Sequence, residues 1–282
     1  MNRSKLILLT AVSVLALAAG SSGRSHASPI PCDTPASPGA AAPNCVEAGT
    51  DYFQTQPGTS FNFGGSIGVV NFQGLPIGPG LTDTIVQRQA DAVIGGAPVP
   101  IQITALSMES TAPVAGFGGV PVYITLDPLN LANDSGMITI GGSLSGGTFS
   151  SNLDVFFDVC ITPGAMGVGC VSATLATAMV SLSQSGAPWL PTPSAGDVIV
   201  TGLTPDQAAN LHTGLLPNEV DFFASGPVTH CGGTGCIDKH IVGPAPVPEP
   251  TTLALLGLAF AGIGLARRRK PNIKTALHPT RR

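Results

Sequence analysis

Hydrophobic and polar residues alternate along several short segments in the middle of the chain. The clearest segment is 152–161, where Leu153, Val155 and Phe157 would face one side of a strand. Segment 120–126 alternates in the same way. Gly, Pro, Asn or Asp separates most of the candidate strands, at spacings near those of a β-sandwich or barrel. The further candidate strands are 60–63, 68–73, 82–87, 100–109, 137–140, 148–151, 171–182, 198–202 and 220–224.

Helical patterns of comparable quality are missing between these strands, which argues against βαβ units. One short helix is predicted at 205–212, because Thr204 can cap it, Pro205 suits its first position and Gly214 can end it. The predicted fold is therefore mainly β. It is a single antiparallel β-sandwich ectodomain with one short helix, plus an N-terminal signal helix and a C-terminal transmembrane helix.

The start of the chain has the three parts of a secretory signal. Arg3 and Lys5 precede an apolar run at 6–19, and a small-x-small sequence ends at Ala27, where we expect cleavage. Secretion would place the protein in an oxidising compartment, which affects how its cysteines are interpreted.

The end of the chain combines a proline motif, an apolar segment and a basic cluster. The apolar segment, 251–266, is typical of a stop-transfer helix because cationic residues follow it. A helix of this length is shorter than the hydrocarbon core, and basic side chains that reach toward the interface can make up part of the difference. The motif and cluster are Val247, Pro248, Glu249, Pro250, Arg267, Arg268, Arg269 and Lys270.

This arrangement resembles the PEP-CTERM sorting signal of Gram-negative bacteria that export extracellular polysaccharide, over residues 247–270. The same module is also catalogued as an ice-binding-protein C-terminal domain. The resemblance implies recognition by an exosortase, a membrane cysteine transpeptidase that would process the chain near 248–250 while it lies in the inner membrane. Members of the family usually end a few residues after the basic cluster, whereas residues 271–282 follow here.

These features predict the organisation of the whole chain. The expected parts are a signal peptide at 1–27, an extended Pro/Ala-rich segment at 28–50, a β-sandwich domain at 51–243, a sorting signal at 244–270 and a cytoplasmic tail at 271–282.

Charge is distributed unevenly along the chain, although the formal net charge is only −4. Between residues 28 and 248 the only basic residues are Arg88 and Lys239, against fifteen acidic ones. Nucleic-acid binding requires a basic surface, so it is excluded as a function of this segment. Anionic membrane surfaces would repel the segment for the same reason.

The six cysteines fall into three pairs that are close in sequence. In a secreted chain we expect disulfides between Cys32 and Cys45, Cys160 and Cys170, and Cys231 and Cys236, although sequence alone cannot choose the connectivity. The competing hypothesis is a metal site at 230–240, where His230 and His240 flank the last pair. No cofactor is predicted.

Catalytic motifs are weak. Segment 142–146 has a Gly-Ser-x-Ser-Gly sequence, which is not the spacing of a nucleophile elbow. Asp154 and Asp158 would lie about 13 Å apart on a strand, beyond the ~5–9.5 Å of paired glycosidase carboxylates. The histidines outside the targeting ends are His212, His230 and His240. We predict that they do not converge with any Ser, Cys or carboxylate and that the protein is not an enzyme.

The leading hypothesis is an exported cell-surface or extracellular-matrix protein of structural or adhesive type, with extracellular polysaccharide as a candidate partner. It would be a membrane-anchored precursor before it reaches the surface or matrix. An alternative is a carbohydrate- or ice-binding module, with a groove that exposes aromatics such as Trp189, Tyr52 or Tyr123. A third hypothesis is a secreted hydrolase without a local motif.

Overall fold

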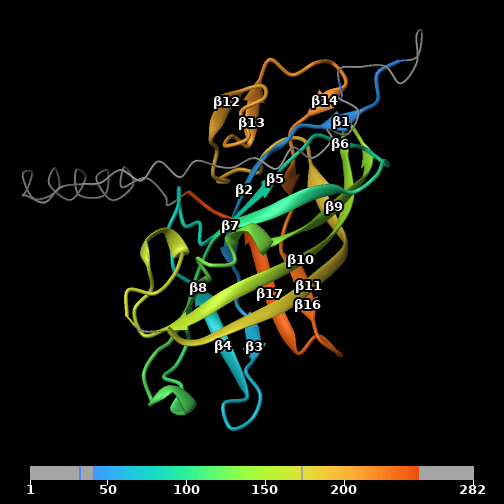
Figure 1. Ribbon diagram of the computed structural model, residues 1–282. Helices are drawn as coiled ribbons and strands as arrows, with labels where there is room; N and C mark the ends of the chain where they lie inside the picture. Colours follow the sequence, from blue (N-terminus) through green and yellow to red (C-terminus); the bar gives the residue numbers. More distant parts are fainter. Residues whose placement is uncertain (1–31, 33–40, 173, 248–282) are drawn as a thin grey trace, which may run out of the picture.

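The computed structural model describes residues 32, 41–172 and 174–247 (Figure 1). Within these residues the chain forms strands and three short 3₁₀ turns, with no α-helix. The predicted signal helix and the predicted transmembrane segment 251–266 lie outside the described residues.

Seventeen strands are distributed along the described chain. They are β1 (Cys45–Val46), β2 (Gly49–Thr55), β3 (Ser60–Asn62), β4 (Val69–Gly74), β5 (Thr84–Arg88), β6 (Ala92–Val93), β7 (Val99–Ser110), β8 (Tyr123–Leu126), β9 (Ser135–Ser143), β10 (Gly146–Cys160), β11 (Thr174–Leu190), β12 (Thr201–Leu203), β13 (Leu211–Thr213), β14 (Glu219–Val220), β15 (Phe223–Ala224), β16 (Val228–Gly232) and β17 (Asp238–Pro244). The 3₁₀ turns are η1 (Ala115–Phe117), η2 (Leu131–Asn133) and η3 (Ala165–Gly167).

Eight strands close into a barrel in which every neighbouring pair is antiparallel. Going around the ring, β10 pairs with β8, β8 with β7, β7 with β4, and β4 with β3. β3 then pairs with β17, β17 with β16, β16 with β11, and β11 returns to β10. Closure leaves no free edge in this ring.

The other end of the barrel closes through a second ring of eight. β7 and β10 are long, and at their other ends β9 replaces β8 between them. In the same way, β5 and β2 replace β4 and β3 between β7 and β17. Strands β7, β10, β11, β16 and β17 therefore belong to both rings and join the two ends into one body (Figure 1).

The β-sandwich prediction is wrong, and the pairs that close the ring show why. Ser183 of β11 pairs with Cys231 of β16, and Lys239 of β17 pairs with Ser60 of β3. These contacts join segments far apart in the chain, and β16 and β17 were absent from the predicted strands. A sandwich and a barrel share the same alternation and turns, so periodicity alone does not separate them.

Side-chain alternation fills the barrel interior. The buried fraction along β10 follows the prediction, with Leu153, Val155 and Phe157 inside. Phe61 packs against Phe157 with ring centroids 5.7 Å apart at one end of the barrel. Near the other end Trp189 stacks on Phe222 at 5.7 Å with a 16° interplanar angle. Aromatic burial of this kind contributes strongly to the stability of small cores.

The helix predicted at 205–212 is also wrong. Within this segment the backbone turns instead: Ala209 N donates to Asp206 O, and the Asp206 carboxylate accepts from Ala208 N. The chain then enters β13, which pairs in parallel with β12. An isolated helix this short has little stability of its own, and the local side-chain turn and strand pairing replace it.

Three disulfides link Cys32 to Cys45, Cys160 to Cys170 and Cys231 to Cys236, as predicted, and no cysteine of the described chain is free. Because Cys231 and Cys236 are bonded to each other, neither sulfur is free to bind a metal ion at the alternative site, 230–240. A separate small sheet, in the order β14-β1-β6, lies beside the first disulfide because Cys45 belongs to β1.

Candidate functional site

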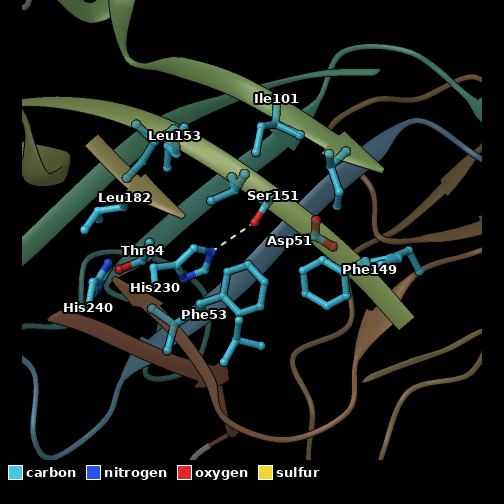
Figure 2. A pocket seen from close by; sticks show the side chains of 16 residues that line it. Asp51, Phe53, Thr84, Ile101, Phe149, Ser151, Leu153, Leu182, His230 and His240 are labelled. Carbon is cyan, nitrogen blue, oxygen red and sulfur yellow. Dashed lines mark hydrogen bonds between the residues drawn. The ribbon is translucent and has the colours of Figure 1, made fainter. Parts of the chain in front are cut away.

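A cavity of about 40 Å³ lies inside the barrel. Its wall is mostly apolar, with a few polar groups on β2, β5, β10, β16 and β17 (Figure 2). A single buried water needs roughly 10–15 Å³, so this space suits a few waters and is far below the ~300–1,000 Å³ of ordinary ligand pockets. The lining residues are Asp51, Phe53, Thr84, Val86, Ile101, Ile103, Ile138, Phe149, Ser151, Leu153, Leu182, Phe222, Val228, His230, His240 and Val242.

His230 projects from β16 into this cavity and meets Ser151 of β10. Its Nε2 lies 3.2 Å from the Ser151 Oγ, the interaction dashed in Figure 2. Burial lowers the pKa of His230 to about 4, because desolvation penalises the charged imidazolium. The ring is therefore neutral near pH 7 and is a weak base there.

His240 lies directly opposite His230 on the neighbouring strand β17. Its Nε2 is 3.2 Å from the Thr55 hydroxyl, which in turn donates to Asp83 Oδ1 at 2.7 Å. Burial, and then the charge of His230, lower the pKa of His240 to about 3. Two facing imidazoles in one apolar interior thus both remain neutral.

Asp83 ends this hydrogen-bonded chain just before β5. Its carboxylate also accepts hydrogen bonds from the Thr55 amide and the Thr84 hydroxyl. Burial raises the pKa of Asp83 to about 6, although these hydrogen bonds act in the opposite direction. The network joins β2, β5 and β17 with satisfied polar groups, which suits a structural role.

A buried ion pair borders the same cavity. Arg88 of β5, only 1% exposed, donates from Nη1 to the Asp51 carboxylate of β2, and its Nη2 donates to Glu47 O at 3.3 Å. The guanidinium carbon lies 4.8 Å from the ring centre of Phe222. Arg88, one of the two basic residues of the ectodomain, is therefore enclosed in the core and paired with Asp51. No local sequence pattern marks Arg88 as buried, because its partner Asp51 lies 37 residues away.

The third histidine lies in a different buried cluster. His212 Nδ1 is 2.6 Å from Asp221 Oδ1, and its Nε2 is 2.9 Å from the Asp206 carbonyl. The prediction that no histidine converges with a Ser, Cys or carboxylate is therefore wrong for His212 and also for His230 and Ser151. Ser151 lies 79 residues from His230, so no local motif could have revealed that contact, whereas His212 meets Asp221 and Asp206 only nine and six residues away.

Other candidate residues are placed less favourably for ligand recognition. Trp189 is 1% exposed, and its Nε1 donates to the Gly141 carbonyl. The Tyr52 hydroxyl donates to Ala208 O, and that of Tyr123 donates to Glu109. These aromatics do not line a common groove among the pockets of the described chain. The described residues also contain no group of three or more His, Cys, Asp or Glu side chains placed to hold a metal ion.

The last described residues are held against the barrel by backbone hydrogen bonds. Ala245, which is 1% exposed, donates to Tyr52 O and accepts from Val198 N. Pro246 O accepts from Leu81 N at 3.1 Å, and Val247 N donates to Gly196 O at 2.7 Å. The chain is thus fixed to the barrel up to the residue before Pro248.

Comparison with known protein families gives one match, to the PEP-CTERM protein-sorting motif, over residues 246–270. The chain carries a PEP-CTERM sorting motif. Curated proteins and solved structures gave no significant match. The motif begins at Pro246, so its first two residues are described, just after β17, and the rest lie outside the described residues.

The PEP-CTERM motif indicates an exported protein that an exosortase sorts to the cell surface. The predicted sorting residues from Pro248 onward and the cleavage site at Ala27 lie outside the described residues. The described part of the chain contains no helix with the length and apolar character needed to cross a membrane. Predictions about the anchor therefore rest on the sequence.

Proposed function

We propose that this exported protein has a structural, non-catalytic role at the cell surface or in the extracellular matrix, with the barrel as a rigid folded unit. The observation that carries the proposal is the interior of the barrel. Its cavity of about 40 Å³ is bounded by packed apolar side chains and by polar groups that bond to one another. Such an interior stabilises the barrel and leaves the outer surface for contacts with the matrix.

The proximity of His230 to Ser151 is the specific observation that favours a hydrolase instead. A serine nucleophile needs a base with a suitable pKa, a group that orients that base, and room for a substrate. His230 has a pKa of about 4, and among the described contacts only Ser151 bonds to its ring. The cavity is also too small for an ester or a peptide. These features favour the structural role.

A complementation experiment separates the two functions. A deletion strain would receive wild type, Ser151→Ala or Glu249→Ala, and matrix retention and cell aggregation would be measured. A structural protein should retain its effect with Ser151→Ala and lose it with Glu249→Ala, because only the second change removes the sorting motif. A folded, correctly sorted Ser151→Ala protein that loses all effect would refute the structural role.

The matched control is Ser150→Ala. Ser150 is the neighbouring residue of β10 and points to the other face of the strand, where its hydroxyl accepts from Gly186 N. It should behave as wild type in both assays. Agreement between the two serine variants would show that the hydroxyl in the cavity has no separate chemical task.

A further inference from the structure

The sorting motif follows the folded barrel without a spacer. Val247 is the last residue with a described hydrogen bond to the barrel, and Glu249 is only two residues further along the chain. An extended chain covers at most about 3.6 Å per residue, so the two Cα atoms are separated by no more than about 7 Å.

This distance is shorter than the diameter of a helix that could surround the motif. A helix with its side chains is about 10–12 Å across. An exosortase that holds Glu249 therefore cannot avoid the barrel surface from which the chain leaves, unless residues 244–247 first detach. Detachment would break the backbone hydrogen bonds of Ala245, Pro246 and Val247 and expose the buried Ala245.

We infer that this end of the barrel is the docking surface for the exosortase, an inference that rests on the sorting function. We call it the exit face and define it as residues 79–81 and 194–197. Both loops bond to the departing chain, since Leu81 N donates to Pro246 O and Gly196 O accepts from Val247 N. The partner is a membrane-embedded transpeptidase, and the predicted membrane segment begins at Thr251, directly after the motif.

The chemistry of the exit face fits close contact with another protein. Six of its seven residues are uncharged, and Pro79, Ser194, Ala195 and Gly196 are exposed. Ser194 N donates to Asp197 Oδ2 at 2.7 Å, and Asp197 N donates to Ser194 O, which fixes the second loop as a tight turn. A preformed loop of small residues lets a partner approach without an ordering cost.

Gly80 shows how closely the chain is held at this surface. An added Cβ at Gly80 would lie 2.7 Å from Pro246 O and 2.5 Å from Val198 Cγ2, and the residue has φ +63°. Only glycine permits both this backbone conformation and this contact. The exit face and the first residues of the motif thus form one surface.

The test uses full-length chains in a host with an exosortase, and the measured quantity is the rate at which the longer precursor disappears. Ser194→Arg combined with Ala195→Arg places two bulky charges on the exit face. The control is Ser66→Arg, an exposed site in the loop after β3, at the Asp238 end of β17 and so at the opposite end of the barrel. Each variant is made twice, with the native chain and with a flexible Gly/Ser spacer between Val247 and Pro248.

With the native chain, we expect the exit-face variant to be processed about tenfold more slowly than Ser66→Arg, because charges buried at an interface without partners oppose docking. With the spacer, the two should be processed at equal rates, because the enzyme no longer has to meet the barrel. Equal rates without the spacer would overturn the inference. So would a difference that persists with the spacer, because that would indicate a folding defect.

Glu249→Ala distinguishes failure of this inference from failure of sorting itself. If Glu249→Ala is processed like wild type, the chain is not an exosortase substrate and both claims fail. If it accumulates as precursor while the exit-face variant matches its control, sorting stands and the docking surface is refuted.

Discussion

Replacement of Arg88 by methionine should destabilise the barrel severely. The guanidinium is enclosed by the Asp51 carboxylate, the Glu47 carbonyl and the Phe222 ring. Arg88→Met leaves the Asp51 carboxylate, which is only 7% exposed as a residue, buried without its partner. Removal of one member of a buried pair costs about 3–5 kcal/mol, a large part of the ~5–15 kcal/mol stability of an ordinary domain.

Urea denaturation at pH 7 would measure this cost. Trp189 is the only tryptophan of the chain and stacks on Phe222, which Arg88 also contacts, so its fluorescence reports on the same region. With a slope of about 2–3 kcal/mol per molar urea, the midpoint should fall by roughly 1–2.5 M. Lys239→Met, a change at the other basic residue of the ectodomain, should cost under ~0.5 kcal/mol because no ion pair holds Lys239 in the described chain.

The double variant Arg88→Met with Asp51→Leu provides the decisive comparison. Replacing both members by apolar residues removes the unpaired charge, so the double variant should be more stable than Arg88→Met alone. Two results would refute the reasoning. One is a loss below about 1 kcal/mol for Arg88→Met, and the other is a double variant that is no more stable than the single one.

Three further predictions follow from described contacts. His240→Gln should reduce the loss of stability at acid pH. Burial lowers the pKa of His240 from the usual 6.5 to about 3, so the wild-type chain loses stability as the pH falls from about 6.5 toward 3, where only the unfolded chain takes up the proton. Equal losses of stability in the wild-type and His240→Gln chains between pH 7 and 4.5 would contradict this. Replacing both cysteines of the 160–170 disulfide by serine should cost about 2–5 kcal/mol by urea denaturation relative to the oxidised wild type, and the difference should disappear when both chains are fully reduced. Gly80→Ala should loosen the hydrogen bond between Leu81 and Pro246 and speed hydrogen exchange of the Leu81 amide, with Gly95→Ala, a positive-φ glycine in open space, as the control that leaves it unchanged.

Local sequence signals predicted the parts of the fold that depend on neighbouring residues. The alternation at 152–161 placed Leu153, Val155 and Phe157 on one face, and the structure buries all three. Close spacing in the sequence also predicted the three disulfides, because a short loop brings its ends together readily. The sorting motif is likewise continuous in sequence, and the family comparison identifies it.

Closure of the barrel and the polar network inside it depend on distant partners. Ser183 meets Cys231, and Thr55 meets His240, across long stretches of chain. The hydrophobic periodicity of a strand does not indicate which other strands it pairs with. The sequence therefore predicted a sandwich where the structure has a barrel. The helix predicted at 205–212 does not form for a related reason. Residues suited to capping a helix are present, but the pairing of β13 with β12 and the turn at Asp206 are more favourable than a short helix.

The placement of β17 has a mechanical consequence. A surface protein that is tethered through its C-terminus receives tension from the cell at Val247, and this tension passes along β17. That strand is hydrogen-bonded to β16 over residues 228–232 on one side and to β2 and β3 on the other. Because antiparallel hydrogen bonds lie perpendicular to the strands, a pull along β17 loads them together in shear and does not open them one after another. In a chain tethered in this way, β17, the last described strand, would serve as the attachment point, and the barrel should resist forces that would unzip a strand held at one edge.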